Sequence, residues 1–151
     1  MLELAQQKAQ RRAAQGKTYW LMADGLDLPF PDNTFDCATT GFALRNVANI
    51  DLALQELCRV LKPGGRLACL ELTPLPGGLS TLLPRLYIER WVPLLGRWVS
   101  GDGPAYQYLP ASVHDLPDAE ALAGAMRRAG FAQTTYRKYN FGSVAIHVGL
   151  K

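Results

Sequence analysis

Three polar stretches of this sequence each follow a segment that is predicted to form a β-strand. They are Asp24-Gly25, the run from Thr40 to Asn46 and the run from Glu71 to Thr73. In an open α/β sheet, ligands bind beyond the carboxyl ends of the strands, so the residues just after each strand are expected to do the chemistry. The sequence therefore predicts a ligand-binding edge that is built from three loops.

The first two stretches suit a ligand that carries an adenine ring. The carboxylate of Asp24 can accept a hydrogen bond from an exocyclic amine, while the backbone N–H that follows it donates to a ring nitrogen. Asp24 could instead simply cap a turn, a common role for Asp. In the second stretch Gly41 has no side chain and leaves space for a ligand to approach the main chain.

The strands that would position these loops are short. Strands are expected over Thr18–Met22 and Phe35–Thr40, which combine β-branched and aromatic residues. The continuous apolar run from Leu67 to Leu70 lies between a Gly-Gly turn and Pro74. This is the pattern of a strand that is buried on both faces of a parallel sheet.

Helices are predicted from the spacing of apolar residues. From Ile50 to Leu61 these residues recur at i, i+3, i+4 and i+7, with Asn49 or Asp51 as the expected N-cap. A weakly amphipathic surface helix is expected over Leu2–Gln15. A strand, a helix and a strand in succession form a right-handed crossover unit.

The end of the chain predicts one more helix and a hairpin. Apolar residues fall on one helix face from Ala119 to Met126, and Gly130 stops that helix. Strands near Thr134–Tyr139 and Ser143–Leu150 are expected to pair as an antiparallel hairpin. Alternating strands and helices predict an α/β fold with a mostly parallel sheet and an antiparallel edge.

Composition excludes several other classes of protein. The 151 residues suffice for one domain, and 48% hydrophobic and 19% charged residues are average for a globular protein. A net charge of +3 is too small for a nucleic-acid-binding surface. The three cysteines are too far apart for a metal clip, and His114 and His147, without a paired ligand, are expected to be structural. The chain is therefore expected to be cytoplasmic and to bind neither metal nor nucleic acid.

The longest apolar stretch runs from Leu79 to Val99. Four charged residues and two prolines interrupt it, so it is not expected to span a membrane. Two interpretations stay open: a lid that packs on the core, or a cover for a polyprenyl tail with a membrane-facing rim of Trp and Arg. Peripheral membrane contact is therefore an expectation beside the cytoplasmic location.

Several motifs carry a resemblance to a known family. They are Asp24–Asp36 with its Leu-Pro-Phe loop, Gly41–Val47 with Leu-Arg-Asn-Val, Arg59–Arg66 with Leu-Lys-Pro-Gly-Gly, and Glu71. Together they resemble the UbiE/MenG family of quinone-biosynthesis C-methyltransferases. The Pro-Phe loop and the Pro-Gly-Gly turn are typical of class I methyltransferases in general, whereas Leu-Arg-Asn-Val narrows the resemblance to this family. Further similarity in the C-terminal half extends it over nearly the whole chain.

The resemblance implies a fold, a cofactor and an acceptor. It implies a Rossmann-like class I methyltransferase fold, with residues 1–151 as a partial domain that carries a substrate-side insertion over about 74–116. The methyl donor would be S-adenosylmethionine (SAM). The acceptor would be a demethylated isoprenoid quinol, with demethylmenaquinol converted to menaquinol as the favoured reaction.

The resemblance also assigns two sets of site residues: cofactor-binding Asp24, Gly25, Thr40 and Gly41, and catalytic Arg45 and Asn46, which would face the acceptor ring. A quinol hydroxyl has a pKa of about 10, like a phenol, and must lose or share its proton first. Arg45 could stabilise the resulting phenolate but stays protonated, so it is not expected to be the base. Alternatively, Arg45 and Asn46 form a loop-anchoring pair, and Glu71 is as suited to capping as to chemistry.

The sequence lacks one feature of the family. Such enzymes open their SAM site with a glycine-rich loop and an acidic ribose-binding residue, and no Gly-x-Gly occurs before Asp24. The chain is therefore expected to be a fragment, the product of a misplaced start, or a truncated homologue. Two other functions stay open: a methyltransferase for another small acceptor, and a non-catalytic remnant that binds a partner. A sheet without its first strands would expose its edges, so a homodimer is expected.

Overall fold

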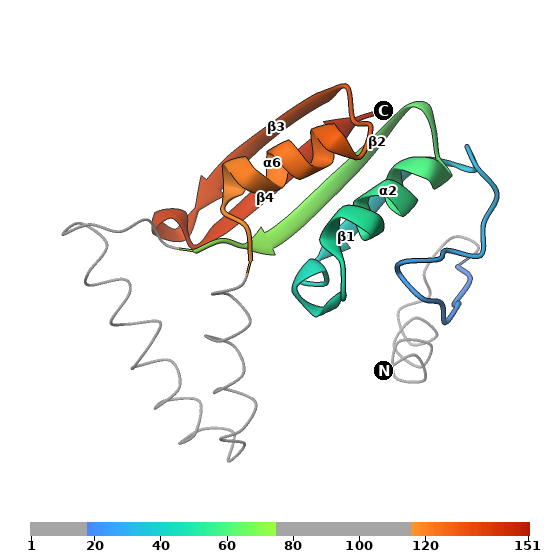
Figure 1. Cartoon of the computed structure of the whole chain (residues 1–151), viewed down its shortest axis with the longest axis horizontal. Coiled ribbons are helices and arrows are strands. Elements are labelled where there is room, and N and C mark those ends of the chain that lie inside the picture. The colour runs from blue at the N-terminus through green and yellow to red at the C-terminus, as the bar shows by residue number, and fades with distance from the viewer. Residues whose placement is uncertain (1–17, 75–115) are drawn as a thin grey trace, which may run out of the picture.

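The computed structural model describes residues 18–74 and 116–151, which form one sheet with two helices on it (Figure 1). In chain order the elements are β1 (Phe35–Gly41), the short 3-10 helix η1 (Leu44–Asn46), α2 (Ile50–Val60), β2 (Leu61–Leu72), α6 (Ala119–Arg128), β3 (Gln133–Tyr139), the 3-10 helix η4 (Asn140–Gly142) and β4 (Val144–Leu150).

The four strands lie in the order β1-β2-β4-β3. β1 and β2 are parallel and are joined through α2, since a parallel pair needs a crossover that returns the chain to the starting end of the sheet. β4 pairs antiparallel with both β2 and β3. The predicted α/β fold with an antiparallel C-terminal hairpin is therefore confirmed, although among the described residues only one strand pair is parallel.

The two helices lie side by side on one face of the sheet (Figure 1). Each begins at a side chain that accepts from a backbone N–H: Asn49 Oδ1 from Leu52 N at 3.1 Å, and Asp118 Oδ1 from Ala121 N at 2.8 Å. Such caps satisfy donors that the start of a helix leaves without a partner. Of the two caps expected for α2, the structure uses Asn49.

The core lies between these helices and the sheet, and close packing there depends on a glycine. A Cβ built on Gly149 of β4 would lie 2.8 Å from Met126 Cε and 2.8 Å from Phe131 Cδ1. Both neighbours are fully buried, so any larger residue would push α6 away from the sheet.

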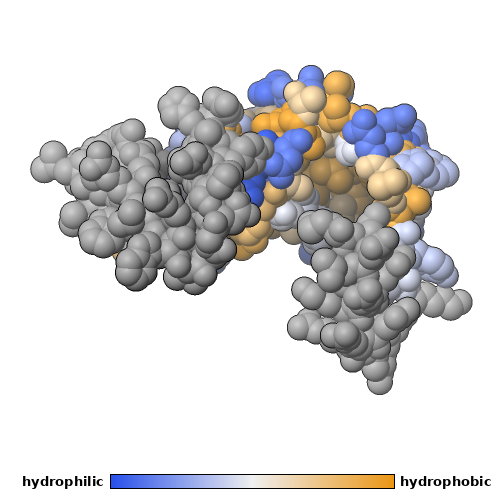
Figure 2. Space-filling view, turned by 90° about the horizontal axis from the view of Figure 1, so that it is seen from below, coloured by the Kyte–Doolittle hydropathy of each residue, from blue (hydrophilic) through white to orange (hydrophobic). Residues whose placement is uncertain are grey.

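Seen from below, the described residues also show apolar surface recessed between polar side chains (Figure 2).

The segment Thr18–Met22 is not a strand, so that prediction was wrong. Tyr19 and Met22 are each 84% exposed. Residue types favour extended backbone, but a strand also needs a neighbour for its N–H and C=O groups. No strand of the described residues pairs with this segment. β2, in contrast, is longer than predicted, because Leu61 already pairs with Phe35.

Several expectations fall on residues outside the described ranges. These are the helix at 2–15, the apolar stretch at 79–99, most of the insertion at about 74–116, and His114. Within residues 18–74 and 116–151, the helices are too short or too polar to cross a membrane.

Candidate active site

The site begins at the carboxyl end of β1, where the chain turns into η1. β1 ends at Gly41, and a Cβ built on this residue would meet nothing within 4 Å. Phe42 follows in a left-handed conformation, with φ of 54°, and its N–H donates to Leu70 O at 2.9 Å. Gly41 thus borders open space, while Phe42 is tied to the neighbouring strand. Thr40, the residue before Gly41, is half-buried and lies in register with Cys69 of β2.

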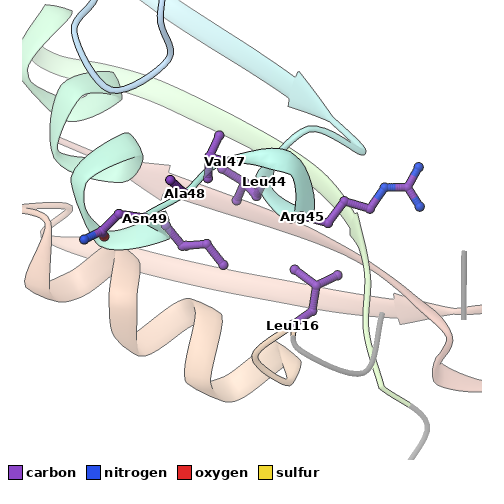
Figure 3. A pocket seen from close by; sticks show the side chains of 7 residues that line it. Leu44, Arg45, Val47, Ala48, Asn49 and Leu116 are labelled. Atoms are coloured by element: carbon purple, nitrogen blue, oxygen red, sulfur yellow. The ribbon is translucent and has the colours of Figure 1, made fainter. Parts of the chain in front are cut away.

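A pocket of about 370 Å³ adjoins η1. It is lined by Leu44, Arg45, Val47, Ala48, Asn49, Ile50 and Leu116. These side chains come from η1, the start of α2 and the segment before α6, and the Arg45 side chain extends away from those of Val47 and Ala48 (Figure 3). Apart from Arg45 and Asn49 the lining side chains are apolar, while polar atoms make up the larger part of the exposed lining.

Arg45 presents hydrogen-bond donors that the described residues do not use. Its Nε and Nη1 atoms are buried and have no partner in the part of the chain that the structure describes. The guanidinium lies beside the Phe42 ring, with Cζ 5.9 Å from the ring centroid. Leaving a buried donor unpaired costs about 1–3 kcal/mol, so most such groups are bonded. An arginine in this state is suited to bind an oxygen of a ligand.

Asn46 stabilises the loop itself. Its side-chain Nδ2 donates to Phe42 O at 3.3 Å, and its backbone N–H donates to Ala43 O at 2.9 Å. Both bonds close the turn that carries Arg45. Of the two roles open for Asn46, loop anchoring is therefore present in the structure, and contact with an acceptor stays a prediction.

Glu71 connects the ends of the two parallel strands. It is only 1% exposed. Its Oε2 accepts from Leu44 N at 3.0 Å and its Oε1 accepts from Leu72 N at 3.1 Å. The carboxylate at the end of β2 thus caps the first residue of η1, which is one of the two roles that the sequence left open for it.

Asp24 and Gly25 lie in an exposed turn before β1. Asp24 Oδ1 accepts from Leu26 N at 2.9 Å, so the turn-capping role is realised in the structure. A single acceptor atom is used in this bond, and the side chain is exposed, which leaves the carboxylate accessible to a second donor. A Cβ built on Gly25 would lie 3.9 Å from Val47 Cγ1. The structure therefore places this turn next to the wall of the Arg45 pocket.

A charged cluster on α2 holds the loop between Asp24 and β1, and sequence reasoning missed it. Arg59 donates to Phe30 O at 2.8 Å, to Leu28 O at 2.9 Å and to Asp32 Oδ1 at 2.7 Å. Glu56 Oε2 accepts from Leu28 N at 2.9 Å. One feature of the sequence could have indicated this cluster. Glu56 and Arg59 are three residues apart, so they lie on one face of the helix. The loop opposite that face has carbonyl groups that no strand was expected to pair.

The same cluster has a defined charge state. A hydrogen bond from Arg59 lowers the pKa of Glu56 to about 2, and the two carboxylates of Glu56 and Asp32 raise the pKa of Arg59 above its ordinary value. Glu56 and Arg59 are therefore both charged throughout the physiological range. Their ion pair, with Arg59 Nε 2.7 Å from Glu56 Oε1, stays formed there.

His147 is part of the core. It is 1% exposed, and its Nε2 lies 2.8 Å from Ala119 O at the start of α6. This position agrees with the expected structural role. Within the two described ranges, no group of three or more His, Cys, Asp or Glu residues is arranged to hold a metal ion.

Comparison with known proteins identifies the family. The profile of the ubiE/COQ5 methyltransferase family matches residues 1–151. The chain is 48% identical over 149 residues to a demethylmenaquinone methyltransferase of Thermus thermophilus, matching 99% of this chain and 66% of that protein. It is 43% identical to the ubiquinone/menaquinone biosynthesis C-methyltransferase UbiE of Saccharophagus degradans, over 100% of this chain and 61% of that one.

Solved structures share the fold at low sequence identity. A SAM-dependent methyltransferase of Thermotoga maritima superposes with a TM-score of 0.66 at 20% identity, covering 100% of this chain and 69% of its own. The [4+2]-cyclase SpnF gives a TM-score of 0.71 at 20% identity, covering 99% of this chain and 62% of its own. Because proteins with different activities share this architecture, these matches establish the fold and nothing further.

The chain spans less than two thirds of the length of these relatives, 66% and 61% in the two cases above. The family profile nevertheless extends over every residue of the chain, so it includes the Leu-Arg-Asn-Val motif after β1 and the Leu-Lys-Pro-Gly-Gly motif, which the structure places at the start of β2. The fold, the family profile and the relatives agree: the chain belongs to the ubiE/COQ5 methyltransferase family.

Proposed function

We propose that this chain carries the acceptor side and the adenine side of a SAM-dependent C-methyltransferase that converts a demethylated isoprenoid quinol, in particular demethylmenaquinol, to the methylated quinol. The observation that carries the proposal is Arg45, a pocket-lining residue whose Nε and Nη1 atoms are buried and have no partner among the described residues. A quinol offers what this arrangement lacks, a flat apolar ring with an oxygen that accepts from a guanidinium.

The residues present fit the adenine end of the cofactor. Asp24 has an exposed carboxylate, Gly25 lies beside the pocket wall, and the space next to Gly41 is open to a ligand. When bound, SAM supplies a methyl group on a positively charged sulfur. Asp24 would accept from the exocyclic amine of the adenine, and the Gly25 N–H would donate to a ring nitrogen.

The chemistry asked of Arg45 is electrostatic. As the quinol hydroxyl loses its proton to water, negative charge spreads from the oxygen to the neighbouring ring carbon. This carbon would form a bond to the methyl group as the carbon–sulfur bond of the donor breaks and a neutral thioether leaves. The ring carbon then loses its own proton to water, and the oxygen regains one, which gives the methylated quinol. Arg45 holds the oxygen and stabilises this charge without taking the proton, because a guanidinium stays protonated.

The relatives support the choice of acceptor. One is named a demethylmenaquinone methyltransferase and another a ubiquinone/menaquinone C-methyltransferase, at 48% and 43% identity. Both names refer to quinones, and the second specifies methylation on carbon. These proteins are longer than this chain, so the activity is proposed for the protein in which this chain provides the Arg45 pocket.

The test is a methyl-transfer assay with SAM and three acceptors: demethylmenaquinol, a simple phenol and a sterol. We expect methylation of demethylmenaquinol only, and a fall in kcat/KM by about 10²–10³-fold in Arg45→Gln, since the charge on the oxygen is then unsupported. Arg137→Gln, which changes an exposed arginine of β3, is the matched control and should leave the rate unchanged. Transfer to the sterol instead would favour another acceptor, and SAM binding without any transfer would favour a non-catalytic remnant.

A further inference from the structure

A buried carboxylate is bonded to the turn that carries Arg45 and is not used by the chemistry described above. Glu71 follows Leu67 and Cys69 on the face of β2 that the helices cover, and all three are buried. Among the described residues no cation contacts it, and its oxygens accept from two backbone N–H groups. Burying a carboxylate without a cation is costly, so the two N–H bonds need to be maintained for the fold to tolerate it.

One of these N–H groups belongs to a turn that cannot satisfy it internally. Leu44 is the first residue of η1, and the residue before it, Ala43, makes no side-chain cap. The internal bonds of η1 are few: Asn46 N to Ala43 O at 2.9 Å, and Val47 N to Leu44 O at 3.4 Å. Glu71, 27 residues further along the chain, therefore supplies the acceptor that a capping side chain normally provides.

The approach to this turn is also conformationally unfavourable. Phe42 has φ of 54°, a region that costs a non-glycine residue about 1–2 kcal/mol. Such a conformation persists only where surrounding contacts enforce it. Here the enforcing bonds are Phe42 N to Leu70 O on one side of the turn and Leu44 N to Glu71 Oε2 on the other. Both acceptors come from β2.

We propose that Glu71 is a positioning residue that fixes η1 so that the guanidinium of Arg45 is presented with two nitrogens free for a ligand oxygen. Arg45 follows Leu44 directly, so a change in the Leu44 anchor moves Arg45 with it. The identity of the ligand oxygen rests on the proposed quinol function. The positioning of η1 by Glu71 does not.

The first test is spectroscopic and needs no ligand. In the full chain, Glu71→Ala should speed hydrogen exchange of the Leu44 amide by about 10–100-fold, the loss expected for one buried bond to a charged group. It should also shift the Nε–Hε resonance of Arg45. Glu71→Gln keeps one oxygen acceptor and should restore both signals in part, and it carries the test if the alanine variant does not fold.

The matched control is Glu56, another carboxylate that anchors a loop through a backbone N–H. Glu56→Ala should speed exchange of the Leu28 amide and leave Leu44 and Arg45 unchanged. Glu71→Ala should speed exchange of the Leu44 amide and leave exchange of the Leu28 amide unchanged. If Leu44 exchange and the Arg45 resonance are the same in wild type and Glu71→Ala, the proposal is wrong.

The second test connects the anchor to binding. Under oxygen-free, reducing conditions, 1,4-dihydroxynaphthalene serves as a quinol probe. Its Kd should rise at least about tenfold in Glu71→Ala, because one charged hydrogen bond between Arg45 and the probe is then lost. In an Arg45→Gln background the same change should have no further effect, because Glu71 acts through Arg45. An equal effect in both backgrounds would overturn the positioning role. If wild type binds no probe, the proposed function fails, and the Leu44 and Arg45 signals still decide the role of Glu71.

Discussion

At the scale of single residues, the hydrogen bonding of Arg45 indicates whether this side chain binds a ligand or stabilises the loop. Its Nε and Nη1 atoms are buried without partners in the described part of the chain, a state that destabilises the fold. Functional sites commonly retain such groups at a cost to stability. Arg45→Met, which keeps the apolar stem and removes the unpaired donors, should leave the free energy of unfolding unchanged or raise it by about 0–1 kcal/mol.

Denaturant unfolding checks this prediction, with Asn46→Ala as the comparison. Asn46 makes a side-chain bond to Phe42 O, so its removal should lower the free energy of unfolding by about 0.5–1.5 kcal/mol. A loss above about 1 kcal/mol in Arg45→Met would mean that the guanidinium holds the loop together, and the binding role would lose its support.

His147 predicts a pH dependence of stability. Burial lowers its pKa below the ordinary value of 6.5, with Lys138 acting in the same direction and Ala119 O and Glu120 against it. The unfolded chain therefore takes up the proton first as pH falls. The contribution of His147 is complete above pH 6.5 and is lost as pH falls from there toward the folded pKa.

Chemical denaturation at pH 8, 6.5 and 5.5 measures this effect. The free energy of unfolding should fall over this range in wild type, and the fall should be smaller in His147→Gln, whose amide does not titrate but can still donate to Ala119 O. An equal fall in both proteins would show that other groups carry the pH dependence.

At the scale of elements, the interaction between α2 and the loop at 24–34 depends on the planar fork of Arg59. Arg59→Lys keeps the charge but cannot reach Glu56, Asp32 and the carbonyls of Leu28 and Phe30 together. We expect the free energy of unfolding to fall by clearly more than in the control. Arg128→Lys is the control, because its single exposed ion pair with Asp51 contributes little, and its loss should stay below about 1 kcal/mol. Equal losses would contradict the role given to the cluster.

Element identity was largely predictable from the sequence, since local patterns determine it. The spacing after Ile50, the Asn49 cap and the Gly130 stop predict α2 and the end of α6 where the structure has them. The failure at Thr18–Met22 has a different origin, because whether an extended segment becomes a strand depends on a partner elsewhere in the chain. Thus local chemistry predicts helices more reliably than strand pairing.

Site geometry was predictable only where topology dictates it. The rule that loops after parallel strands share one edge predicts that the segments at Gly41 and Glu71 lie together, and they do, through the bond from Leu44 N to Glu71. The unpaired state of Arg45 and the bonds of Arg59 to Leu28 and Phe30 depend on side-chain conformation. No spacing in the sequence specifies those conformations.

At the scale of the whole molecule, the sheet presents two open edges and one open face among the described residues. β1 and β3 are the end strands, and no described strand pairs with the outer edge of either. On the face away from the helices, Ile146 is 36% and Val148 40% exposed. Unpaired edges and apolar faces favour association with another chain, so the expected self-association stays a prediction.

Cys37 provides a direct probe of this association. It is exposed on β1, whereas Cys58 and Cys69 are buried. If two β1 strands pair antiparallel, a short thiol cross-linker should join two chains through Cys37, and Cys37→Ser should abolish the product. Light scattering should give the mass of two or more chains. A monodisperse monomer, or cross-linking that survives in Cys37→Ser, would rule out pairing through β1.

The central claim is that the turn at Asp24 and the loop after β1 form one site that takes a SAM donor next to Arg45. Calorimetric titration of the full chain with SAM tests it most directly. The account predicts measurable binding that Asp24→Ala weakens by about tenfold and that Asp27→Ala, a neighbouring exposed carboxylate, leaves unchanged. No heat up to millimolar SAM, or equal weakening by both substitutions, would contradict the account.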